Sequence, residues 1–138
     1  MVLMILFPVW HASVTDGEMT LFPLQYTVKT GDVKGIMYFP YCLSAILAIA
    51  AATVAIIEIG KFGDRLLQLK LGALNSVLMA GALGSAVYFA MQLIQTNQVS
   101  GEYGFGMWLP FIAMVSNLIA NRFIRKDEKI VKDSNRIR

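Results

Sequence analysis

The chain has 138 residues, of which 57% are hydrophobic and 15% charged, and its mean hydropathy is +0.60. Soluble domains carry about 25% charged residues, so this composition excludes an ordinary soluble enzyme, and the length excludes two domains. The net charge is +3, with one cysteine, Cys42, and one histidine, His11. These counts exclude an internal disulfide and a cysteine-rich or histidine-rich metal site.

The first apolar segment, residues 1–10, is too short to cross a bilayer. Ten helical residues cover about 15 Å, half of a hydrocarbon core. The segment has no basic start and no small-residue cleavage site, so it does not resemble a signal peptide. We expect the last half of a span whose beginning lies outside this chain. The alternative is a short interfacial helix that ends at Pro8.

A polar segment follows, from Trp10 to Tyr38. Residues 24–29 partly alternate between apolar and polar, residues 30–32 are typical of a turn, and residues 33–37 follow. This pattern predicts a small β-hairpin, which would need support from the helix ends because two strands alone are marginal in water. A later loop, residues 100–106, has three glycines and predicts a tight return at the membrane surface.

Three longer apolar segments predict membrane-spanning helices over residues 38–59, 71–95 and 107–124. About 20 helical residues match a hydrocarbon core of about 30 Å. The second segment has 25 residues without a charge, so it tilts or emerges at one end. We therefore expect an all-α polytopic transmembrane bundle, with three full spans and a partial one, in a single domain over residues 1–138.

The tail, residues 122–138, predicts a basic amphipathic helix that either continues the last span or lies on anionic headgroups. The tail and the connection 60–70 hold ten of the twelve Lys and Arg residues, on one side of a three-span path. The positive-inside rule therefore predicts a multi-pass protein of the bacterial inner membrane with a cytoplasmic C-terminus. The candidate lipid-docking or partner-docking residues are Arg122, Arg125, Lys126, Lys129 and Lys132. Nucleic-acid binding is not expected.

A stripe of small residues follows one side of the second predicted span, at Gly72, Ser76, Ala80 and Gly84. Small side chains at every fourth position let another helix approach closely in lipid. The stripe predicts a helix-packing face. A partner subunit or the chain's own bundle could occupy it, and the sequence does not decide between them.

The candidate functional residues among the polar side chains inside the apolar segments are Asn75, Asn117, Asn121 and Glu58. Asn117 and Asn121 are four residues apart and share a helix face. Hydrogen bonds between helices explain the asparagines adequately, and a polar permeation path is the alternative. Glu58 is an intramembrane carboxylate and therefore a candidate for function, but it lies within one turn of Lys61, so we expect it to form a salt bridge at the cytoplasmic surface.

Three segments resemble a known family. They are residues 62–71 with Leu74 and Asn75, residues 101–106 with Leu109 and Pro110, and residues 118–138. These segments are similar to a small integral membrane family of Bacteroidetes, catalogued as domain of unknown function 4293. The resemblance implies four transmembrane helices, of which the first opens on a short basic start that this chain lacks. It implies no activity and no catalytic residues.

No HExxH, GxSxG or P-loop motif occurs in the sequence, so we expect neither an enzyme nor a cofactor. Our leading hypothesis is a non-catalytic accessory or scaffold subunit of a larger inner-membrane complex, in contact with membrane lipids and partner subunits. The alternative is a small oligomeric transporter or channel, with the asparagines and Glu58 along its path.

Overall fold

The structure is a computed structural model that describes residues 1–15, 17–61 and 63–136. Its elements in chain order are η1 (Val2–Leu6), β1 (Trp10–Val14), β2 (Gly17–Leu21), β3 (Tyr26–Thr30), β4 (Val33–Met37), α1 (Leu43–Gly60), α2 (Arg65–Asn97), β5 (Glu102–Tyr103), η2 (Phe105–Met107) and α3 (Trp108–Arg136). Phe62, at the start of one family-like segment, and residues 137–138, at the end of the predicted tail, lie outside the described residues.

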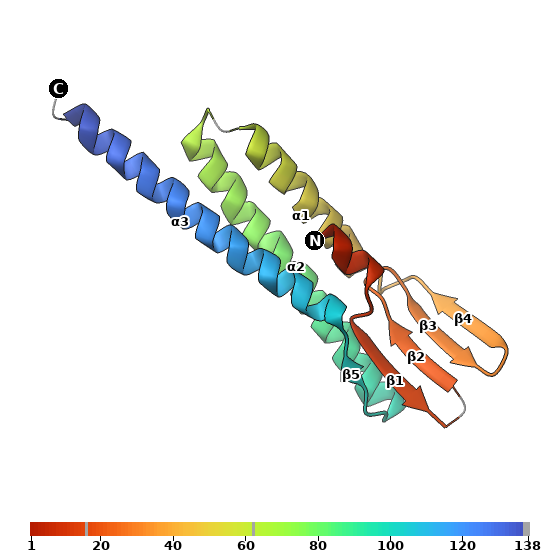
Figure 1. The fold of residues 1–138 in the computed structure, drawn as a ribbon. Coiled ribbons are helices and arrows are strands. Elements are labelled where there is room, and N and C mark those ends of the chain that lie inside the picture. The colour runs from red at the N-terminus through yellow and green to blue at the C-terminus, as the bar shows by residue number, and fades with distance from the viewer. Residues whose placement is uncertain (16, 62, 137–138) are drawn as a thin grey trace.

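The prediction of an all-α bundle is wrong, because the described residues include a five-stranded antiparallel sheet beside the helices. The order of the strands is β4-β3-β2-β1-β5, a meander closed at one edge by two residues of the loop between α2 and α3. The hairpin expected over residues 24–37 is present as β3–β4, but it is only part of this sheet. The chain is therefore mixed α/β, and the sheet lies against one end of the helices (Figure 1).

The sheet forms because alternate side chains of three strands line up on one face. The register places Trp10 opposite Leu21, and Leu21 opposite Tyr26. Next to this row, Ala12 faces Met19 and Met19 faces Val28. Since successive side chains of a strand point to opposite faces, these two rows form one apolar surface. That surface packs against Phe89, Ala90 and Leu93 of α2 in a single buried cluster.

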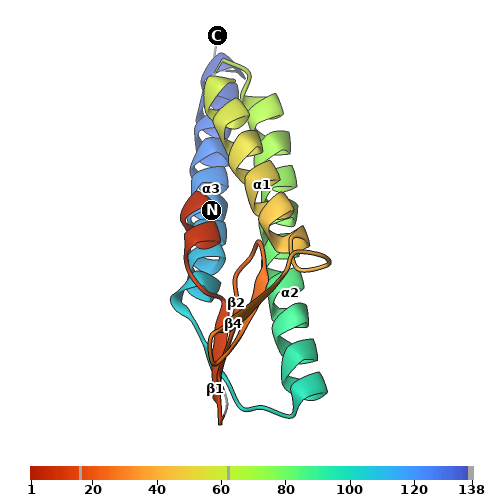
Figure 2. The same cartoon turned by 90° about the vertical axis from the view of Figure 1, so that its right-hand side faces the viewer.

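Helix α2 serves both the helical region and the sheet. Its 33 residues extend about 50 Å, far more than a bilayer requires. A Cβ at Gly81 would lie 3.4 Å from Leu47 of α1. Because α1 and α2 are antiparallel, the start of α1 at Leu43 lies at about the height of residue 85 of α2. The last twelve residues of α2, 86–97, therefore extend beyond α1 by about 18 Å. This extension carries the sheet, as Figure 2 shows.

Three helices within the described ranges are long and apolar enough to cross a membrane: Leu43–Gly60, Arg65–Asn97 and Phe105–Ser134. The carboxylate of Asp64 caps the start of α2, accepting a hydrogen bond from the backbone N–H of Leu67 at 3.0 Å. Both α1 and α3 pack on α2, which lies between them (Figure 1). The connection between α1 and α2 and the end of α3 lie at the end opposite the sheet (Figure 1).

Residues 1–10 form the short 3₁₀-helix η1 and lead into the first residue of β1. Met4 and Val9 are fully buried, in a cluster with Ala48 of α1 and Ala86 of α2. The N-terminal segment therefore packs on the half of the helical region that lies nearest the sheet, and it connects this half to β1.

Candidate functional site

The densest polar contact between helices lies where α2 crosses α3 at Gly72. The side-chain N–H of Asn117 donates to the carbonyl oxygen of Gly72 at 2.9 Å and to the hydroxyl oxygen of Ser76 at 2.8 Å. The Ser76 hydroxyl donates in turn to the same Gly72 carbonyl at 3.0 Å. A Cβ at Gly72 would overlap the side-chain amide of Asn121. Glycine at this position therefore lets α3 approach α2 closely enough to form the contact.

Asn75 and Asn121 are buried beside this contact, with exposed fractions of 1% and 8%. The Oδ1 atoms of both side chains have no hydrogen-bond partner among the described residues. A buried acceptor without a donor costs about 1–3 kcal/mol. The region therefore holds two amide oxygens that the described part of the chain leaves unsatisfied.

Glu58 lies near the end of α1 and is also buried, with an exposed fraction of 7%. The sequence predicts a salt bridge for this side chain, with Lys61 one turn away. Within residues 1–15, 17–61 and 63–136, the ion pairs instead join His11 to Glu102 at 3.8 Å and Lys132 to Glu128 at 2.7 Å. The Glu58 carboxylate therefore packs on the inner face of α1 without an ionic partner in this part of the chain.

The four small residues of the predicted stripe do not share one environment. Gly72 is buried and Ser76 is half-buried, whereas Ala80 and Gly84 are exposed. A Cβ built at Gly84 would meet no atom within 4 Å. Positions four apart advance by about 40° around a helix of 3.6 residues per turn, so the stripe turns from the α3 contact toward the outer face of α2.

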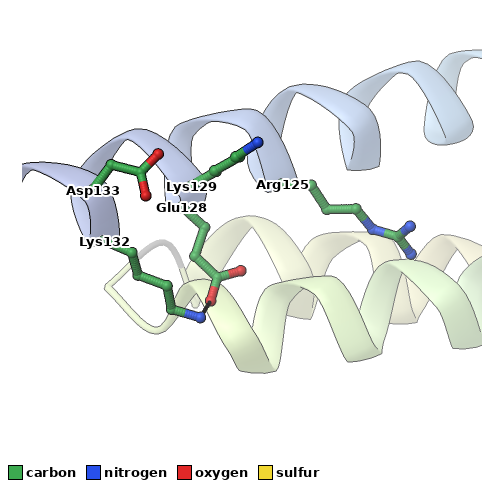
Figure 3. A pocket seen from close by; sticks show the side chains of 5 residues that line it. All are labelled: Arg125, Glu128, Lys129, Lys132 and Asp133. Atoms are coloured by element: carbon green, nitrogen blue, oxygen red, sulfur yellow. Dashed lines mark ion pairs between the residues drawn. The ribbon is translucent and has the colours of Figure 1, made fainter.

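The basic residues gather at the end opposite the sheet and line three open grooves. Arg125 lines all three, and Arg122, Lys129 and Lys132 each line one or two. Figure 3 shows the groove of about 500 Å³ on the last turns of α3, where Glu128 and Lys132 form their ion pair. Lys126 lines another of these three grooves, which has a volume of about 720 Å³ and is also lined by Ile119 and Phe123. Unpaired cations beside exposed apolar side chains favour contact with amphipathic anions.

This arrangement offers helix packing, hydrogen bonding and attraction of anions. In the part of the chain that the structure describes, no group of three His, Cys, Asp or Glu side chains lies close enough together to hold a metal ion. The surfaces and contacts that this part of the chain does offer are the polar contact at Gly72, the outer face of α2 and the basic grooves.

The segments at residues 62–71, 101–106 and 118–138 suggest membership of a known family, and comparison with family models tests this. The model described as Domain of unknown function (DUF4293) matches residues 1–137. The chain belongs to the DUF4293 family. No curated protein and no solved structure matches it. Since this family description names no activity, the role of this DUF4293 chain has to be argued from its own residues.

The sequence analysis missed the main packing face of α2 in this DUF4293 chain. The buried residues follow alternating spacings of three and four: Gly72, Asn75, Met79, Ala82, Ala86, Phe89 and Leu93. Such a spacing averages 3.5 residues and keeps one face toward the neighbouring helices. This signal is present in the sequence, but the fourfold repeat of small residues drew attention to a different side of the helix.

Proposed function

We propose that this chain is a non-catalytic accessory or scaffold subunit of a larger bacterial inner-membrane protein complex. The observation that carries the proposal is the outer face of α2. Ala80 and Gly84 are exposed there, and open space surrounds Gly84. Close approach of another helix to such a face is a main source of helix association in lipid.

The use of the polar side chains supports the same proposal. Asn117 is committed to the Gly72 carbonyl and Ser76, both within the chain, at the α2–α3 interface. Asn75 and Asn121 are buried close to that interface. A permeation path needs several polar side chains that face water, whereas Asn75 is almost fully buried and Asn117 is hydrogen-bonded within the chain. This favours a packing role over the transporter or channel alternative.

The orientation belongs to the same proposal, with the C-terminus in the cytoplasm. Its support is that Lys61 and Arg65, on the α1–α2 side, and the basic residues of α3 gather at one end of the molecule, while Lys29 and Lys34 lie on the sheet (Figure 1). By the positive-inside rule the first end is cytoplasmic and the sheet is periplasmic. A cysteine at Lys34 should then react with a membrane-impermeant maleimide in intact spheroplasts, in a Cys42→Ala background, and a cysteine at Lys132 should not. The reverse pattern would overturn the orientation.

The scaffold role is tested by affinity purification of the full chain in a mild detergent, followed by mass spectrometry. The wild type should retain a stoichiometric companion, and Gly84→Leu should lose it because the leucine fills the contact face. Ser116→Leu is the matched control, since Ser116 is exposed on α3 and the same side chain is introduced there. A chain recovered without any companion, or as a homo-oligomer alone, would contradict the proposal.

A further inference from the structure

One of the three basic grooves lies between α2 and α3, and its lining differs from that of the other two. It has a volume of about 480 Å³ and lies on the basic side of the Gly72 contact. Its lining residues are Ala73, Ser76, Leu118, Asn121, Arg122 and Arg125. Two cations, two uncharged polar side chains and two apolar side chains therefore meet in one concave surface.

The two arginines of this groove have no ionic partner in the described part of the chain. The ion pair on the tail joins Lys132 to Glu128, one and two turns further along α3. Arg122 and Arg125 are three residues apart, so their side chains leave the helix on neighbouring positions. The planar guanidinium group binds the oxygens of a phosphate through two parallel hydrogen bonds. The charge of the groove therefore fits a phosphate group.

The inner wall adds a second requirement. Asn121 is 8% exposed and its Oδ1 atom has no donor among the described residues. The Asn121 side chain rests against Gly72. An amide rotates readily about its last torsion, which would bring Oδ1 to the groove. A ligand that brings a hydroxyl group would satisfy this acceptor.

The outer wall is apolar. Leu118 is 54% exposed, and it lies one turn before Arg122 on the part of α3 that is apolar enough to cross a membrane. Along α3 the surface therefore changes from apolar to cationic over a single turn. A ligand that matches this order has a hydrocarbon part on the side of Leu118 and an anionic part at the arginines.

We propose that this groove binds an anionic glycerophospholipid whose headgroup carries a hydroxyl, of the phosphatidylglycerol class. The phosphate lies between Arg122 and Arg125, the headgroup hydroxyl donates to Asn121, and an acyl chain follows Leu118. Basic pockets between helices at a membrane surface are known to select anionic headgroups. The inference rests on the helices crossing a membrane and does not depend on the scaffold role.

The test is native mass spectrometry of the full chain, released from detergent with equal amounts of phosphatidylglycerol and phosphatidylcholine. The wild type should retain one phosphatidylglycerol. Arg122→Gln with Arg125→Gln should weaken retention by about tenfold or more, since both charge-assisted contacts are lost. Lys126→Gln with Lys132→Gln is the matched control, because it removes the same charge from the same helix outside this groove, and it should retain the lipid.

Three further results decide the outcome. Equal losses in the two double variants would overturn the proposal, because attraction would then be diffuse. Displacement of the lipid by millimolar inorganic phosphate would also overturn it, because the site would then select a free anion. The double variant Arg122→Lys with Arg125→Lys keeps both charges and is the milder change, so the test does not depend on the glutamine variant folding. It should bind the lipid more weakly than the wild type does. Unchanged binding would contradict the bidentate contact. The affinity purification described above tests the scaffold role independently, so failure of one proposal does not imply failure of the other.

Discussion

The side-chain amide of Asn117 on α3 donates to the backbone carbonyl of Gly72 on α2 at 2.9 Å, across 45 residues of sequence. The same nitrogen reaches the hydroxyl oxygen of Ser76 at 2.8 Å. These bonds join the two helices at a point where Asn75 and Asn121 are also buried. Because hydrogen bonds between helices in lipid contribute about 1 kcal/mol each, this small contact sets the position of α3 on α2 without dominating the stability.

Replacing Asn117 by leucine should lower the free energy of unfolding by about 1–2 kcal/mol, since two hydrogen bonds are lost while the Gly72 carbonyl keeps the donors of its own helix. The measurement is reversible unfolding in mixed micelles of mild detergent and dodecyl sulfate. Ser116→Ala serves as the control, because Ser116 bonds only to Ile112 of its own helix. Equal losses in both variants would show that the contact between helices carries no special weight.

Gly72 and Gly84 make a matched pair of positions on one helix. A Cβ at Gly72 would overlap the Asn121 amide, whereas a Cβ at Gly84 would meet nothing within 4 Å. Gly72→Ala should therefore cost about 1–3 kcal/mol through overpacking. Gly84→Ala should be neutral or stabilising, because alanine is the better helix former. The same unfolding assay compares the two, and a loss of stability at Gly84 as large as that at Gly72 would contradict the packing described here.

The helices could be predicted from the sequence more completely than the sheet. Long stretches without charge give an unambiguous signal, and α1, α2 and α3 each overlap a predicted span. Strand β1 also carries a signal, since Trp10, Ala12 and Val14 alternate with His11 and Ser13. The apolar segment before it, residues 1–10, favours the end of a span instead and so masks this alternation. Strand β5 has only two residues, and two residues cannot show a period.

The end of α2 that packs on the sheet shows that apolar character alone does not distinguish a lipid-facing side chain from one buried against protein. Phe89, Ala90 and Leu93 are as apolar as a lipid-facing surface, but they pack on Trp10 and the sheet. In the candidate site, the shared face of Asn117 and Asn121 follows from their spacing. The acceptor of the Asn117 bond is a backbone carbonyl, and every residue has one, so the sequence could not identify it.

The glycine-rich loop that follows α2 packs so closely on Trp10 and Pro8 that two of its positions have no room for a side chain. A Cβ at Gly101 would overlap the indole ring of Trp10, and one at Gly104 would overlap the carbonyl oxygen of Pro8. Gly101→Ala should therefore displace Trp10, which is fully buried between the sheet and α2. In a Trp108→Phe background, where Trp10 is the one remaining tryptophan, its fluorescence should shift to longer wavelength.

Gly35→Ala is the control for the loop, because a Cβ there would lie 3.8 Å from the nearest atom, the carbonyl oxygen of Val28, an ordinary contact. Its emission spectrum should match that of the parent. If Gly101→Ala also leaves the spectrum unchanged, the loop does not fix the tryptophan and the origin of the three glycines has to be sought elsewhere.

Tyr26 makes the stability of the fold depend on pH in the alkaline range. Burial raises the pKa of its phenol above the usual value of 10.0, and the neighbouring phenol of Tyr41 raises it further. The two rings lie with centroids 5.3 Å apart, and Tyr41 also contacts Phe89 of α2 at 5.4 Å. Tyr26 is therefore held in its neutral form at the junction of the sheet, α1 and α2.

The sign of the effect follows from proton linkage. The unfolded chain releases this phenolic proton at a lower pH than the folded chain, so the folded state binds more protons in the alkaline range. The contribution of Tyr26 to stability is fully present below the unfolded tyrosine pKa and is lost as the pH rises through the folded value. Tyr26→Phe keeps the ring and removes the proton, so the midpoint of thermal unfolding should fall less steeply above pH 10. Tyr38→Phe, at an exposed tyrosine, should retain the steep fall of the wild type. Parallel curves for the wild type and Tyr26→Phe would mean that the junction opens before Tyr26 ionises.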